Sequence, residues 1–197
     1  MLTTAPKKFF LFFGSPTFKA EVFLIRFFLN WLYIFFCINK TLEGKVSRED
    51  VISATEYVFP SLEILDTRID RQDISSGKFR TVFDTISDNA ANAGIVYGTQ
   101  KHKPDKFDLR YVGSIVYRNG EVEETGLGAG VLDDPVSGII WLVERLSKYN
   151  QKISPGEIIL SGSFIRPIEA RKGDKFYADF GDFGLVGGGA AGLELDR

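Results

Sequence analysis

The feature that most constrains the fold is a nearly unbroken apolar run from Val22 to Ile38, VFLIRFFLNWLYIFFCI. Only Arg26 and Asn30 interrupt it, and its residues follow neither the 3.6-residue period of a helix nor the two-residue period of a strand. Its length is near the lower limit for a membrane span, where an arginine is costly. Three interpretations stay open: a membrane anchor, a buried helix or pair of strands, and a segment foreign to the ancestral protein.

The bulk composition excludes several classes of function. Lys and Arg number 24 and Asp and Glu number 26, so the chain lacks the basic excess typical of nucleic-acid-binding proteins. Its single cysteine, Cys37, excludes an internal disulfide framework and a cysteine-based zinc site. Its single histidine, His102, lies in a polar stretch where we expect a solvated loop residue. Any chemistry must therefore depend on carboxylates, amides, hydroxyls or lysines.

From Thr41 onward the pattern is typical of a globular domain. Ser47 followed by Asp50 predicts a helix start, and the helical spacing continues to Val58, with a stop at Pro60. Further signals are a strand in SLEILDTRI, a hairpin turn at Asn119-Gly120, a helix from Pro135, a strand in ISPGEIILSGSF and a strand after Lys172-Gly173-Asp174. We therefore expect a strand-rich α+β fold with two or three helices.

Two glutamates lead into or lie within apolar segments. Glu63 lies in the predicted strand PSLEILDTRI, where burial of a carboxylate is costly unless it is paired or bound to a metal. Glu21, in KAEVF, leads into the apolar run. The alternative for Glu63 is a solvent-facing position given by simple strand alternation, and the alternative for Glu21 is an ordinary surface position.

A polar cluster surrounded by small residues is the second candidate site. Asp84, Asp88, Asn89 and Asn92 lie within FDTISDNAANAGIVYG, where Ala and Gly leave room for a close ligand. Amide and carboxylate side chains suit a polar ligand that carries carboxylate and keto groups. The alternative is a cap, with Asp88 beginning a helix over NAANAGIV, and the two interpretations are compatible.

Two serines and a glycine-rich loop complete the list of candidates. Ser161 and Ser163 flank Gly162 at the predicted end of a strand, which is also an ordinary place for polar residues. The loop GLGAG lacks both the G-x-G-x-x-G spacing and a following Lys-Ser/Thr pair. We therefore reject a nucleotide site there.

Five segments occur in an order that resembles a known family. They are PSLEILDTRI, VFDTISDNAANAGIVYG, DLRYVGSIVYRNGEVEETGLGAGVL, IIWLVERLSKY and GEIILSGSFIRPIEARKGDKFYADFGDFG. In order and spacing, from about Val46 to Gly184, they resemble the hydratase/decarboxylase branch of the fumarylacetoacetate hydrolase-like superfamily. Within that branch they look most like hydratases of seven-carbon 2-oxo dioates. The resemblance implies a mixed β-sheet roll or barrel-like core with a few peripheral helices.

The resemblance also implies a metal site. Family members hold one divalent cation, usually Mg²⁺ and otherwise Mn²⁺, with two carboxylates of an E-x-E strand and a third from the strand LEI. Glu63 matches the third ligand and Glu21 the first acid of E-x-E, whereas the second acid falls on Phe23, which cannot bind a metal. The cation would polarise the 2-oxo group of the substrate by Lewis-acid stabilisation of a developing oxyanion.

By the same resemblance, a set of polar side chains would line the pocket for a small 2-oxo acid: Asp84, Asp88, Asn89, Ser161 and Ser163. The implied reaction is addition of water to a 2-oxo-dienoate diacid in the catabolism of aromatic compounds. Decarboxylation, isomerisation, C–C hydrolysis and a catalytically impaired homologue are the alternatives. A cytoplasmic homo-oligomer is expected, with no nucleic-acid partner and with a membrane contact only through residues 22–38.

The chain departs from the family pattern at both ends. Nothing before Glu21 resembles the family's Gly-His-Lys loop, so the catalytic base is unknown. The resemblance breaks at Val22 and at Val186, and our hypothesis is that both ends are truncated or altered. We therefore expect an atypical apolar segment over residues 1–40, a hydratase-like domain over 41–186 and a flexible Gly/Ala-rich tail over 187–197.

Overall fold

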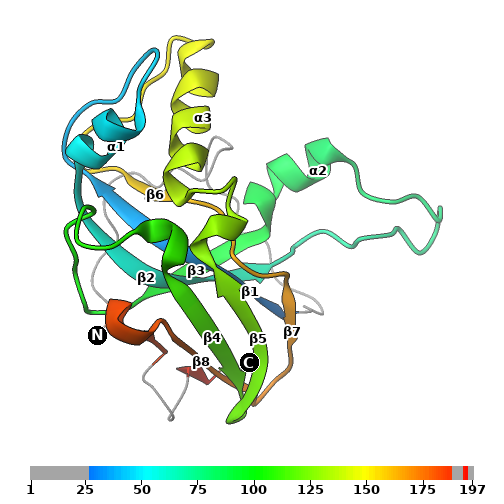
Figure 1. The fold of residues 1–197 in the computed structure, drawn as a ribbon. Helices are drawn as coiled ribbons and strands as arrows, with labels where there is room; N and C mark the ends of the chain where they lie inside the picture. The colour runs from blue at the N-terminus through cyan, green and yellow to red at the C-terminus, as the bar shows by residue number, and fades with distance from the viewer. Residues whose placement is uncertain (1–26, 188–192, 195–197) are drawn as a thin grey trace.

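The computed structural model describes residues 27–187 and 193–194, which form two antiparallel sheets with few helices (Figure 1). The first sheet has the order β3-β2-β1-β6, with β7 also paired to β1, and contains β1 (Phe27–Ile38), β2 (Thr55–Asp66), β3 (Asn92–Tyr97), β6 (Ile158–Leu160) and β7 (Ile168–Ala170). The second has the order β10-β8-β4-β5, with β9 paired to β8, and contains β4 (Gly113–Arg118), β5 (Glu121–Leu127), β8 (Lys175–Asp179), β9 (Leu185–Val186) and β10 (Leu193–Glu194).

Helices cover one end of the sheets, where α1 (Arg48–Ala54) lies beside α3 (Pro135–Ser147) (Figure 1). A third helix, α2 (Val82–Ser87), stands apart from them. Four short 3₁₀ turns complete the part of the chain that the structure describes: η1 (Asn89–Ala91), η2 (Leu109–Tyr111), η3 (Gly128–Gly130) and η4 (Gly181–Phe183). The expected α+β fold is confirmed, with many short strands and three helices of more than one turn.

Residues 27–38 of the apolar run form the central strand of the first sheet. β1 pairs with β2 along one edge and with β6 and β7 along the other. Leu32, Ile34 and Phe36 are fully buried in the core, while Phe35, on the opposite face, is only 4% exposed and stacks with Tyr97. Because both faces are covered, nearly every position is apolar, which explains the missing two-residue period.

The described part of the apolar run, residues 27–38, forms one buried strand, where the expectation was a buried helix or a pair of strands. Within residues 27–187 and 193–194, no helix is long and apolar enough to cross a membrane. The sheet begins N-terminal to residue 40, where we expected a domain boundary, because β1 supplies the pairing edge for three other strands. Residues 27–38 therefore pair with strands of the expected hydratase-like domain, and the division into three parts, including the tail from residue 187, stays a prediction.

The expected helix stop at Pro60 is wrong. The capping box of Ser47 and Asp50 begins α1 as expected, but the helix ends at Ala54, and β2 runs straight through Pro60. The Pro60 carbonyl accepts a hydrogen bond from the Gly98 N–H at 2.9 Å, so the Pro60 nitrogen also faces away from β1. No β1–β2 hydrogen bond is lost there, and the proline is tolerated where β3 ends.

The β4–β5 hairpin and helix α3 agree with their sequence signals. Asn119 and Gly120 have φ values of 54° and 87° in the turn that joins β4 and β5. Asp134 caps α3 through the Val136 N–H, and Pro135 occupies the first turn. His102 differs from the prediction, because its ring lies 4.9 Å from the rings of both Phe107 and Phe183 and is partly buried.

Residues 67–87, which we call the arm, extend from the end of β2 through α2 and stand out from the body of the molecule (Figure 1). Large apolar side chains are exposed there, including Ile74 at 96%, Phe79 at 65% and Phe83 at 75%. The arm therefore depends on polar contacts, rather than on the core, to keep its position.

Replacement of Phe36 by alanine should lower the free energy of unfolding by about 3–5 kcal/mol, because it leaves a cavity between the two sheets. Phe79→Ala is the matched control, since its exposed ring on the arm should contribute less than about 0.5 kcal/mol. Urea unfolding followed by circular dichroism measures both. Equal losses would contradict the central position of β1.

Candidate active site

A carboxylate that is only 1% exposed lies in the middle of the first sheet. Glu63 belongs to β2, and the two strands that flank β2 each direct a donor to it. The Tyr33 hydroxyl of β1 donates to Glu63 Oε2 at 2.9 Å, and the Asn92 amide of β3 donates to Oε1 at 2.7 Å. We call these three side chains the Glu63 cluster. Both carboxylate oxygens thus have a hydrogen-bond donor, as a buried carboxylate requires.

Burial controls the protonation of the Glu63 cluster. Removal from water raises the pKa of Glu63 above its ordinary value, while the hydrogen bonds from Asn92 and Tyr33 act in the opposite direction. Burial also raises the pKa of Tyr33, and the charge of Glu63 raises it further. Tyr33 therefore keeps its proton and acts as a neutral donor.

The Asn92 side chain is placed by a strained turn. Asn89, Ala90 and Ala91 have φ values of 51°, 53° and 65°, so three successive non-glycine residues occupy the left-handed region. Each such residue carries a conformational cost that the surrounding contacts must offset. The turn brings the chain from α2 into β3 and leads directly to Asn92.

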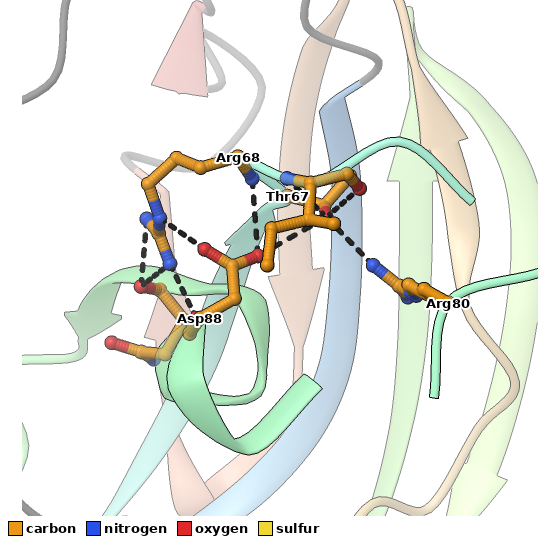
Figure 2. A network of polar contacts seen from close by, with 6 residues as sticks. Thr67, Arg68, Arg80 and Asp88 are labelled. Carbon is orange, nitrogen blue, oxygen red and sulfur yellow. Dashed lines mark hydrogen bonds and ion pairs between the residues drawn. The ribbon is translucent and has the colours of Figure 1, made fainter. Parts of the chain in front are cut away.

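The contacts that hold this turn centre on Asp88, whose side chain is 3% exposed (Figure 2). Its carboxylate accepts from Arg68 Nε at 2.5 Å and from the Arg68 backbone N–H at 3.0 Å. Arg68 Nη2 also donates to the Asp88 carbonyl at 2.6 Å and lies 3.4 Å from the Asn92 carbonyl. Arg80 Nη1 donates to Thr67 Oγ1 at 2.7 Å. This hydrogen bond links the segment just before α2 to the first residue of the arm.

The structure separates the residues that were predicted to line one substrate pocket. Thr81 caps α2, and the Asp84 carboxylate completes the capping box by accepting hydrogen bonds from Thr81, which lower the pKa of Asp84. Asp88 is bound to Arg68 and its side chain does not cap η1, so the alternative interpretation, a cap of a helix over NAANAGIV, is wrong. Asn89 is exposed in the strained turn. A substrate role for Asp84, Asp88 and Asn89 stays a prediction.

The two serines lie on the other side of β1. The Ser161 backbone N–H donates to the Ile34 carbonyl at 3.2 Å, and its buried hydroxyl has no hydrogen-bond partner within the described ranges. The Ser163 hydroxyl donates to the Ile165 carbonyl at 2.7 Å. Neither hydroxyl is hydrogen-bonded to the Glu63 cluster among the residues that the structure describes, so their substrate role also stays a prediction.

An open groove of about 760 Å³ is formed by residues of the arm. Its walls include Arg68, Lys78 and Arg80 together with Asp70, Asp73 and Asp84. Positive and negative side chains are balanced, and Glu63 is not part of the lining. The groove therefore has no net charge that would favour an anion.

The described residues do not by themselves fit a divalent metal. Mg²⁺ requires about six hard oxygen ligands, several of them from carboxylates or water. No group of three His, Cys, Asp or Glu side chains that could hold a metal occurs within residues 27–187 and 193–194. The strands beside Glu63, β1 and β3, contain no Asp or Glu. Glu21 and Phe23, which the resemblance relates to the E-x-E acids, lie outside the described residues.

The sequence did not reveal Tyr33 or Arg68 as members of this region. Tyr33 lies inside an apolar run without a period, so nothing distinguished it from its neighbours. Arg68 lies near the end of the predicted strand SLEILDTRI that contains Glu63, and an arginine so close to a buried acid was the available signal.

Sequence comparison identifies relatives among hydratases, although no family model matches the chain. The chain is 48% identical over 152 residues to 2-oxo-hept-4-ene-1,7-dioate hydratase of Escherichia coli, a match that covers 77% of this chain and 57% of the relative. It is 37% identical over 144 residues to 2-hydroxyhexa-2,4-dienoate hydratase of Comamonas testosteroni, with 73% and 52% covered. The chain thus spans little more than half the length of these relatives.

Solved structures share the fold. 4-Oxalocrotonate decarboxylase from Pseudomonas putida G7, complexed with magnesium and adipate, matches with a TM-score of 0.73 and 28% identity over 82% of this chain and 59% of that one. Fumarylpyruvate hydrolase from Pseudomonas aeruginosa, in complex with Mn²⁺ and pyruvate, has the same fold with a TM-score of 0.57 and 12% identity, over 86% and 66%. The chain therefore belongs to the fumarylacetoacetate hydrolase-like superfamily, in the branch that contains these hydratases and decarboxylases.

Proposed function

We propose that the protein is a hydro-lyase that adds water to a 2-oxo-dienoate diacid of the 2-oxo-hept-4-ene-1,7-dioate type. The observation that carries the proposal is the 48% identity to a hydratase of that substrate, over a segment that includes the buried Glu63. The neighbouring decarboxylase and hydrolase structures hold adipate and pyruvate, which are small carboxylic acids like the proposed substrate. Assembly as a homo-oligomer and a location in the cytoplasm are part of the proposal and rest on resemblance alone.

The proposed cofactor of the complete site is Mg²⁺ or Mn²⁺. Support comes from the ions in the neighbouring structures and from the hard oxygen ligand that Glu63 offers. Such an ion would supply Lewis-acid polarisation of a 2-oxo group. Among the described residues, Glu63 is the ligand that the resemblance assigns to this ion, and Glu21 would have to contribute from the segment before β1.

The Glu63 cluster suggests a second candidate, a family member that keeps the fold and does not turn over substrate. It is favoured by the neutral donors on both oxygens of Glu63 and by the lack of acids in β1 and β3. Decarboxylation, isomerisation and C–C hydrolysis of a 2-oxo acid are the remaining alternatives, since named neighbours of this fold carry out each of these reactions.

Purified protein with Mg²⁺ or Mn²⁺ should consume 2-oxo-hept-4-ene-1,7-dioate, followed by its ultraviolet absorbance, and release a hydrated product without CO₂. Glu63→Gln should lower the rate by at least about 100-fold, because a proton-transferring or ligating carboxylate is lost. Glu169→Gln, at an exposed position of β7, is the matched control and should keep full activity. Binding of oxalate without turnover of any 2-oxo acid would support the second candidate instead.

The raised pKa of Glu63 predicts a pH dependence of stability. The folded protein holds the Glu63 proton to higher pH than the unfolded chain, so the Glu63 contribution to stability falls as the pH rises above 4.5, the ordinary value. The melting temperature of Glu63→Gln relative to the native chain should therefore increase between pH 4.5 and pH 8, as measured by circular dichroism.

Asp50 provides the control of opposite sign. Hydrogen bonds from Ser47 lower the pKa of this exposed carboxyl, so its contribution is present above its ordinary value of 3.8 and disappears as the pH falls below it. The melting temperature of Asp50→Asn should approach that of the native chain only in acid. A difference between Glu63→Gln and the native chain that does not change with pH would contradict the assignment of Glu63.

A further inference from the structure

A one-residue shift in the pairing of β2 with β3 places Asn92 on the same face of the sheet as Glu63. Glu63 pairs with Ile95, and a continuation of that register would place Ala93 opposite Leu65. The register instead shifts by one residue, and Leu65 pairs with Asn92. Leu65 lies two positions from Glu63 and therefore shares its face. Without the shift, the Asn92 side chain would point to the opposite face.

The shifted register needs support from outside the β2–β3 ladder. An extra residue in one strand is left unpaired and disrupts the hydrogen bonds around it. The turn that precedes Asn92 adds a further cost, because Asn89, Ala90 and Ala91 all have positive φ values. Contacts other than the ladder and the turn must therefore hold Asn92 where it meets Glu63.

The Arg68 guanidinium bridges the two ends of that turn. At the first end, Nε donates to Asp88 Oδ1 at 2.5 Å and Nη2 donates to the Asp88 carbonyl at 2.6 Å (Figure 2). At the second end, Nη1 and Nη2 both lie 3.4 Å from the Asn92 carbonyl. A planar group with five donors in a fixed fork can make these contacts together, whereas the compact amine of a lysine cannot.

We propose that Arg68 is a positioning residue of the candidate active site: by bridging Asp88 and Asn92, its guanidinium maintains the β2–β3 register shift and so keeps the Asn92 amide on Glu63. The inference rests on the proposed function only in treating Glu63 as part of the active site. Loss of the bridge lets β3 pair in the unshifted register, and Glu63 Oε1 then loses its donor.

The test follows the side-chain amide of Asn92 by ¹H–¹⁵N NMR in the full-length protein at constant pH. Asn92→Ala identifies the resonance by its absence. Arg68→Lys keeps the positive charge and a donor for Asp88 but removes the planar fork. Arg80→Lys is the matched control, because this second arginine of the arm donates to Thr67 Oγ1 rather than to the turn. Near-ultraviolet circular dichroism verifies that each variant is folded.

In the native chain and in Arg80→Lys, an Asn92 amide proton should resonate downfield and be protected from exchange with water, because it is bonded to a buried carboxylate. In Arg68→Lys, the downfield shift should disappear and exchange should become about tenfold faster, as expected for the loss of an ordinary hydrogen bond.

An unchanged Asn92 signal in folded Arg68→Lys would overturn the proposal, as would an equal loss of that signal in Arg80→Lys. The proposal would also be wrong if the native chain gave no protected downfield signal from Asn92. If Arg68→Lys does not fold, Asp88→Asn takes its place, since it leaves Arg68 present and removes the charge that orients the guanidinium. The same results then support or overturn the proposal.

The outcome is independent of the hydratase proposal, because the NMR signal does not depend on turnover. Loss of the Asn92 signal in Arg68→Lys, without turnover of any 2-oxo acid by the native chain, would reject the proposed reaction and keep the bridging role of Arg68. Turnover by the native chain, together with an unchanged Asn92 signal in Arg68→Lys, would keep the reaction and reject that role.

Discussion

The structure depends on the pairing and coverage of β1. This strand pairs with β2 along one edge and with β6 and β7 along the other, and both of its faces are buried. Its apolar side chains join the two sheets into one core, because Leu32, Ile34 and Phe36 belong to the same cluster as Val116 and Phe176 of the second sheet. Removal of β1 would leave β2 without a partner on one edge and would take the Tyr33 donor away from Glu63.

The buried carboxylate of Glu63 is stabilised by hydrogen-bond donors from two different strands. An isolated carboxylate in a sheet interior is strongly unfavourable, whereas one with a donor on each oxygen can be tolerated. Here the donors come from the two strands beside β2, Tyr33 on β1 and Asn92 on β3. The arm contributes indirectly, because Arg68 and Asp88 fix the strained turn that leads to Asn92 (Figure 2). The position of Glu63 therefore depends on hydrogen bonds from both neighbouring strands.

Short-range signals in the sequence predicted most of the fold. The capping box at Ser47, the Asn119-Gly120 turn and the proline at the start of α3 act over a few residues, and each lies where its pattern indicates. Glu63 was identified as a candidate because its strand is otherwise apolar. The position of Tyr33 against Glu63 was not predictable, since it depends on the register between two strands thirty residues apart. Pro60 misled the prediction for a related reason: whether its missing N–H matters depends on which edge of the strand it faces.

Pro60 also restricts which alternative pairings β2 can adopt. Its nitrogen now faces the end of β3, where no β1 hydrogen bond is required. A slip of one residue between β1 and β2 would exchange the two faces of β2 and direct the Glu63 carboxylate into the hydrophobic core. The same slip would turn the Pro60 nitrogen toward β1 and remove a hydrogen bond from the centre of the sheet. Pro60 thus disfavours a misregistered pairing of this long strand during folding. It lies three positions from Glu63, the charged residue that such an error would direct into the core.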